Sequence, residues 1–196
     1  LHGVGASVVN ALSNWLEVRI YSEGKVYMQR YERGHVVQKL EVVGECEADK
    51  TGTMVTFSPD GSIFEEIVYD YDVLKQRLRE MAFLTKNLRI VLRDERGEEA
   101  VEKDFHYEGG IKEFVQYLNR SKTALYPEVM YFEGTKDNVY VEVAMQHNDS
   151  YNESVFSFVN NITTPEGGTH LTGYRNAITK TFNDYARSAK LLKESE

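Results

Sequence analysis

The N-terminal stretch LHGVGAS places two glycines, Gly3 and Gly5, on either side of one residue and directly before a segment with helical spacing. Backbone N–H groups converge at such a turn and the positive end of the helix dipole lies beside them, so the arrangement favours a phosphate group. Glycine suits the turn because a Cβ would restrict the backbone angles and obstruct the phosphate oxygens. The spacing by itself is also typical of an ordinary tight turn, since short glycine patterns before helices are common.

Two familiar phosphate-binding motifs do not fit this stretch. A Walker A loop ends in Gly-Lys-Ser/Thr, which is absent here, and a dinucleotide-binding fingerprint needs a preceding strand and a third glycine. The glycine turn therefore predicts neither of these two classes of nucleotide site.

Adjacent carboxylates are the other candidates for chemistry, and they occur at Glu65/Glu66, Asp94/Glu95 and Glu98/Glu99. Neighbouring side chains in a strand or charged loop point to different faces, and no histidine accompanies these pairs at the spacing of metal ligands. The five histidines are scattered, and Cys46 has no second cysteine or histidine near it in sequence. We therefore expect solvated charge at these pairs, with no catalytic residue and no metal site in this sequence.

The composition limits the class of protein. The chain has 196 residues, of which 41% are hydrophobic, which suits one large domain or two small ones. A net charge of −8 argues against a general nucleic-acid coat, because neutralising phosphates requires excess Lys and Arg; any DNA contact must be local. The lone Cys46 and the lack of an apolar run of about 20 residues predict a cytoplasmic protein without a membrane partner.

The elements that follow the glycine turn must position it. Apolar residues recur at helical spacing over Ser7–Leu16, which predicts a buried helix. Alternating apolar and polar residues over Leu16–Glu32 predict a hairpin that turns at Glu23 and Gly24. A further strand is expected over Thr51–Asp60, where turn residues stand at both ends of an apolar stretch.

The remaining sequence predicts a helix at Tyr71–Leu84 and then a strand in NLRIVLRDE. A charged tract follows, and the change in composition after it predicts a domain boundary near Phe105. Beyond that boundary we expect a sheet with helices. Its predicted elements are a short helix at 111–118, a hairpin at 129–148 turning at 135–138, a strand at 154–162 and a helix at Thr169–Ala189.

Several longer segments, taken together in chain order, resemble one protein family. They are LHGVGASVVNALS, KTGTMVTF, FLTKNLRIVLRDER, FHYEGGIKEFVQYLNRSK, VEVAMQHNDSY, FSFVNNI and EGGTHLTGYRNAITKTFNDYA. The first resembles the third motif of the GHKL ATPases. The full set is similar to the B subunits of type IIA DNA topoisomerases, which comprise gyrase and topoisomerase IV, and the form FHYEGGIK leans toward gyrase. The resemblance covers essentially all 196 residues.

The resemblance implies an α+β fold. Residues 1–105 would form the C-terminal part of a GHKL (Bergerat) ATPase α/β sandwich that lacks its N-terminal part. Residues 106–196 would form a transducer domain like domain 2 of ribosomal protein S5, truncated at its C-terminal end.

The resemblance also implies site residues. The backbone that would wrap the triphosphate of ATP comprises Leu1, His2, Gly3, Val4 and Gly5. Thr53 matches a threonine that hydrogen-bonds toward the adenine, and a short hydroxyl on a strand suits that task. Arg175 matches an arginine that faces a cavity able to hold a DNA duplex. Without the family, Thr53 would be an ordinary strand residue and Arg175 a surface residue.

The family's general-base Glu and Mg²⁺-binding Asn would precede Leu1, and its γ-phosphate Gln and Lys would follow Glu196. Because the chain begins inside a motif, we expect a fragment. Without the family's general base it should bind ATP in context but not hydrolyse it alone, and without the N-terminal arm through which the family dimerises it should be a monomer. The implied ligands and partners are ATP with Mg²⁺, double-stranded DNA, the gyrase A subunit in an A2B2 tetramer, and aminocoumarin-type inhibitors.

The implied function couples ATP binding and hydrolysis to DNA strand passage and negative supercoiling. Two other interpretations stay open. The chain could be the equivalent subunit of topoisomerase IV, which decatenates DNA, or a non-catalytic nucleotide-binding scaffold module.

Overall fold

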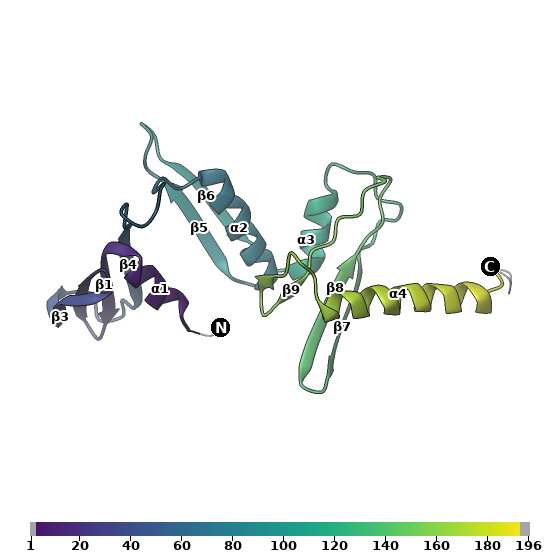
Figure 1. Cartoon of the computed structure of the whole chain (residues 1–196), viewed down its shortest axis with the longest axis horizontal. Helices are drawn as coiled ribbons and strands as arrows, with labels where there is room; N and C mark the ends of the chain where they lie inside the picture. Colours follow the sequence, from purple (N-terminus) through teal and green to yellow (C-terminus); the bar gives the residue numbers. More distant parts are fainter. Residues whose placement is uncertain (1–2, 193–196) are drawn as a thin grey trace. The chain divides into compact units, whose positions relative to one another are not determined.

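A computed structural model, drawn in Figure 1, describes residues 3–192 as helices and antiparallel strands, in agreement with the expected α+β class. The chain divides into two compact units between Asp70 and Tyr71. The domain boundary expected near Phe105 lies within the second unit, where β5 (Arg89–Asp94) and β6 (Val101–His106) form one antiparallel hairpin. The assignment of 1–105 and 106–196 to two family domains therefore stays a prediction.

The first unit is a helix followed by a four-stranded sheet. Its elements are α1 (Gly5–Ala11), β1 (Ser13–Ser22), β2 (Lys25–Glu32), β3 (His35–Glu45) and β4 (Gly52–Pro59). The strand order is β3-β2-β1-β4, and every pair is antiparallel. The predicted β1–β2 hairpin is confirmed, with Glu23 and Gly24 at φ 52° and 73° in its two-residue turn. The strand predicted at Thr51–Asp60 is confirmed as β4.

The buried helix predicted over Ser7–Leu16 is wrong in both length and burial. Helix α1 ends at Ala11, none of its residues is buried, and the Ser13 hydroxyl donates a hydrogen bond to the Val9 carbonyl at 2.6 Å. Residues from Ser13 onward instead pair with β4, where Leu16 lies opposite Phe57. Strand β1 pairs with both β2 and β4 and buries Leu16, so long-range pairing and burial override the local helical spacing. Strand β3 had no counterpart in the sequence prediction.

The sheet has one largely apolar face and one face that mixes charged and apolar side chains. Residues directly opposite in an antiparallel register share a face, so Leu16, Val18 and Ile20 of β1 lie beside Phe57, Val55 and Thr53 of β4. On the other face, Glu17 and Arg19 form an ion pair, with Arg19 Nε 2.7 Å from Glu17 Oε1. Leu16 is buried, whereas Val55 is 53% exposed, so the apolar face is only partly covered.

The second unit comprises two longer helices, a short helix and three antiparallel strand pairs. Its elements besides β5 and β6 are α2 (Tyr71–Leu84), α3 (Gly110–Asn119), β7 (Met130–Lys136), β8 (Val139–Met145), β9 (Phe158–Val159), β10 (Ile162–Thr163) and α4 (Thr169–Ser188). The predicted helices α2, α3 and α4 and the β7–β8 hairpin are confirmed. The single strand predicted at 154–162 is wrong. It is replaced by the small β9–β10 hairpin, which turns at Asn160 and Asn161 with positive φ.

An aromatic cluster forms the core of the second unit. Phe83 of α2 and Phe105 of β6 are fully buried, and Phe114 of α3 is 5% exposed. The rings of Phe83 and Phe114 stack with centroids 5.0 Å apart. These contacts fix α2 and α3 together, because large aromatic side chains bury much apolar area and hold preferred ring geometries.

Candidate nucleotide-binding site

The glycine turn leads directly into α1. Gly3 has φ +76°, in the left-handed region where glycine is strongly favoured, and Val4 is the N-cap residue without a side-chain cap. A Cβ added at Gly3 or Gly5 would meet no atom within 4 Å, so their backbone borders open space. Leu1 and His2 lie outside the described residues. Because α1 has only seven residues, its dipole alone makes a weak anion site.

Thr53 lies on the edge strand β4, on the apolar face of the sheet. It pairs with Ile20, and Val55, two residues along, lies on the same face. Its side chain is exposed, so its hydroxyl is available to donate and accept hydrogen bonds. A hydroxyl set among β-branched apolar side chains suits a flat ring that carries polar edges.

The structure places the end of α1 and Thr53 toward opposite ends of β1. The Asp60 N–H donates to the Leu12 carbonyl at 3.0 Å, directly after α1 and beside the start of β1. Thr53 pairs with Ile20 near the other end of the strand. With a rise of about 3.3 Å per residue, the segment from Ser13 to Ile20 spans roughly 23 Å.

Asp60 anchors the end of α1. It is 4% exposed, accepts hydrogen bonds from the Ser62 hydroxyl and N–H at 2.7 and 2.9 Å, and pairs with Arg33 at 2.8 Å. The hydrogen bonds from Ser62, assisted by the Arg33 charge, hold the pKa of the Asp60 carboxyl below its usual value. This anchor was missed in the sequence because Arg33 and Asp60 are distant along the chain.

Arg175, the residue matched to a DNA-facing arginine, lies on α4 in the second unit. Its side chain is 53% exposed, and its Nη2 lies 3.1 Å from Glu153 Oε2. The exposed guanidinium is therefore accessible, although a neighbouring carboxylate balances part of its charge.

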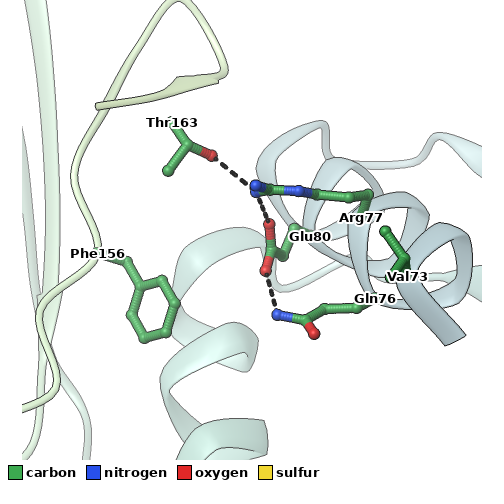
Figure 2. Close-up of a pocket in the computed structure, with 6 residues that line it drawn as sticks. All are labelled: Val73, Gln76, Arg77, Glu80, Phe156 and Thr163. Carbon is green, nitrogen blue, oxygen red and sulfur yellow. Dashed lines mark hydrogen bonds and ion pairs between the residues drawn. The ribbon is translucent and has the colours of Figure 1, made fainter. Parts of the chain in front are cut away.

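A small cavity of about 300 Å³ lies in the second unit beside α2, as Figure 2 shows. Its lining residues are Val73, Gln76, Arg77, Glu80, Phe156 and Thr163. Arg77 donates hydrogen bonds to Glu80 at 3.0 Å and to Thr163 at 3.4 Å. The i,i+3 spacing of Arg77 and Glu80 could have predicted their ion pair, but no local pattern predicts Thr163. The hydrogen bond from Arg77 to Thr163 links α2 to strand β10.

The carboxylate pairs do not assemble into a site in the described part of the chain. Asp94 accepts hydrogen bonds from the guanidinium and the backbone N–H of Arg96, which lower the pKa of Asp94 to about 2. Among residues 3–192, no three or more His, Cys, Asp or Glu side chains are grouped to hold a metal ion. Over the same residues, no helix is both long and apolar enough to cross a membrane.

Comparison with known proteins places these features in one family. The DNA gyrase B family model matches residues 110–196. The chain is 53% identical to the DNA gyrase B subunit of Clostridium acetobutylicum, covering 100% of this chain and 30% of that protein. It is 54% identical to the DNA topoisomerase 4 B subunit of Enterococcus faecalis, covering 100% of this chain and 28% of that protein.

A solved structure supports the same relationship. The 43K ATPase domain of Thermus thermophilus gyrase B, in complex with an aminocoumarin, superimposes with a TM-score of 0.82. The two are 41% identical, and the match covers 98% of this chain and 52% of that one.

The gyrase and topoisomerase IV relatives are almost equally similar to this chain, at 53% and 54% identity. The chain spans about 30% of the length of these curated relatives. Its fold and its sequence, matched from end to end, make it a homologue of the B subunits of type IIA DNA topoisomerases.

Proposed function

We propose that the chain forms the ATP-binding and transducing segment of a gyrase-type B subunit, in which ATP binding and hydrolysis drive DNA strand passage and negative supercoiling. The observation that carries this proposal is the 53% identity to a gyrase B subunit over the entire chain. The site geometry supports it, because Gly3 and Gly5 border open space and Thr53 stands on an apolar sheet face.

In this proposal the backbone of Gly3, Val4 and Gly5 contacts the triphosphate, together with Leu1 and His2. The Thr53 hydroxyl contacts the adenine, and Val55 lies beside the ring. ATP supplies the free energy for the cycle, and Mg²⁺ accompanies its phosphates. The similar ATPase domain in complex with an aminocoumarin extends the proposal to inhibitors of that class.

The second unit carries the transducing role in this proposal. Arg175 on α4 meets double-stranded DNA, and the working enzyme pairs the B subunit with gyrase A in an A2B2 tetramer. An acidic chain with a net charge of −8 makes only local, readily released DNA contacts, which suits a segment that lets DNA pass. The proposed location is the cytoplasm.

A segment exchange tests the proposal. The positions of Clostridium acetobutylicum gyrase B that match this chain are replaced by the 196 residues, and the chimera is combined with its gyrase A. We expect ATP-dependent negative supercoiling of relaxed plasmid, within about tenfold of the parent enzyme. A folded chimera that binds no ATP and introduces no supercoils would contradict the proposal.

Topoisomerase IV is the second candidate, favoured by the 54% identity to the Enterococcus faecalis subunit. The same exchange into that subunit, assayed for decatenation of linked DNA circles, separates the two. A chimera active only in decatenation would assign the chain to topoisomerase IV. Absence of ATP turnover in both folded chimeras would favour a nucleotide-binding scaffold.

A further inference from the structure

Lys86, just after α2, reaches the β7–β8 hairpin. Its Nζ lies 3.0 Å from Glu142 Oε1 on β8 and 3.3 Å from the Tyr131 hydroxyl on β7. The Lys86 and Glu142 side chains are 44% and 21% exposed. A single ammonium group therefore contacts both strands of the hairpin.

The hairpin needs this positive charge. Glu133 and Glu142 lie directly opposite each other in the β7–β8 register, and like charges at such positions repel. The Tyr131 hydroxyl lies 2.6 Å from an oxygen of each carboxylate, but it has one proton and cannot donate to both fully. Tyr140 donates a further hydrogen bond to Glu133 at 2.6 Å. Lys86 supplies a positive charge, which the neutral hydroxyls of Tyr131 and Tyr140 cannot supply.

The protonation states agree with this geometry. The hydrogen bond with Glu142 raises the pKa of Lys86. Hydrogen bonds from Tyr131 and Tyr140 lower the pKa of Glu133. Lys86 and Glu133 are therefore both charged near neutral pH.

Because Gly110 has no side chain, it leaves space for the Lys86 side chain. Gly110 has φ +61°, and a Cβ built on it would lie 2.5 Å from Lys86 Cε and 3.1 Å from Lys86 Cγ. The segment FHYEGGIK, which contains Gly110, and the segment FLTKNLR, which contains Lys86, thus meet at one point. A substitution at Gly110 would strain the backbone and displace the lysine stem together.

We propose that Lys86 is a positioning residue for energy coupling, which holds the β7–β8 hairpin to the end of α2 so that the hairpin follows this helix when nucleotide binds. The inference rests on the proposed function, and the contact crosses the domain boundary predicted near Phe105. A half-exposed ion pair contributes little to global stability, so its loss acts on the hairpin position rather than on folding.

The first test uses the gyrase chimera with Lys86→Met. ATP hydrolysis stays within about twofold of the unsubstituted chimera, while supercoils introduced per ATP fall about fivefold or more. Lys75→Met is the matched control, because Lys75 lies on α2 and pairs with Asp72 of the same helix; its supercoiling per ATP stays unchanged. Exchanging the charges, with Lys86→Glu and Glu142→Lys together, restores the ratio.

The second test needs no enzymatic activity. In the 196-residue chain, Lys86→Met speeds hydrogen exchange at the β7 and β8 amides by about tenfold without lowering the melting temperature. Unchanged exchange, or an unchanged ratio of supercoils to ATP in an active chimera, would overturn the inference. Equal losses of hydrolysis and supercoiling with a lowered melting temperature would also overturn it, since that is a structural role. An unsubstituted chimera that fails to supercoil counts against the proposed function instead.

Discussion

The ring of Phe83, on α2, stacks on the ring of Tyr107, which follows β6, with centroids 3.6 Å apart and planes inclined by 16°. Phe83 also lies 5.0 Å from the ring of Phe114. Phe83 is 1% exposed, so its stacking is fully shielded from water. One side chain thereby joins α2, the β5–β6 hairpin and α3.

Removing this side chain should destabilise the second unit strongly. Phe83→Ala leaves a cavity among rings that cannot collapse freely, and we expect a loss of about 3–5 kcal/mol in the free energy of unfolding. Urea unfolding of the 196-residue chain, followed by circular dichroism, measures it. Phe132→Ala, at a side chain 48% exposed on β7, should cost much less; equal losses would contradict the assigned core.

Asp60 should make the first unit sensitive to acid. Its folded-state pKa lies below the usual 3.8, so its stabilising contribution is present above that value and is lost as the pH falls through the folded pKa. Asp60→Asn keeps a side-chain acceptor for Ser62 but removes the ion pair with Arg33. The variant should be less stable at neutral pH and lose less stability on acidification.

Melting temperatures between about pH 6 and pH 2 measure this dependence. Asp184→Asn, at an exposed i,i+4 pair with Lys180 on α4, is the control. If Asp60→Asn and the parent chain lose stability in parallel over the acid range, the role of Asp60 is refuted.

Thr53→Val should weaken ATP binding without unfolding the sheet. Valine keeps the β-branched shape and removes the hydroxyl, so we expect roughly tenfold weaker binding of a fluorescent ATP analogue to the gyrase chimera. Thr56→Val is a close control, because Thr56 lies on β4 but pairs with Glu17 on the opposite face of the sheet. Equal effects from the two substitutions would rule out a specific contact at Thr53.

Arg175→Gln should weaken the response of the chimera to DNA. Losing one phosphate contact makes the slope of log K for DNA binding against log salt concentration shallower by about one. We expect DNA stimulation of ATP hydrolysis to fall, while hydrolysis without DNA stays the same. Arg89→Gln, which breaks another exposed arginine–carboxylate pair, with Asp104 on β5–β6, is the control. A DNA response unaffected by Arg175→Gln would exclude the contact.

The local sequence pattern predicted the secondary structure correctly wherever neighbouring residues determine the backbone conformation. Helix α2 has the predicted bounds, Tyr71–Leu84, because its helix formers and apolar spacing agree. The β7–β8 turn falls at Asp137 and Asn138, within the predicted segment, because these residue types tolerate positive φ. The family motifs likewise predicted Gly3 and Thr53 as nucleotide-binding residues, because a motif is recognised from residues that are close together in the sequence.

The tertiary structure decided features whose energy comes from distant partners. It ended α1 at Ala11, because Leu16 gains more from pairing opposite Phe57 than from another helical turn. It also brought Lys86 to Glu142, a meeting that no local periodicity encodes. The sequence by itself determined the locally encoded elements and the family resemblance. Long-range pairing and burial, summed over the folded chain, determined strand β3, the β9–β10 hairpin, where the elements stop and which side chains meet.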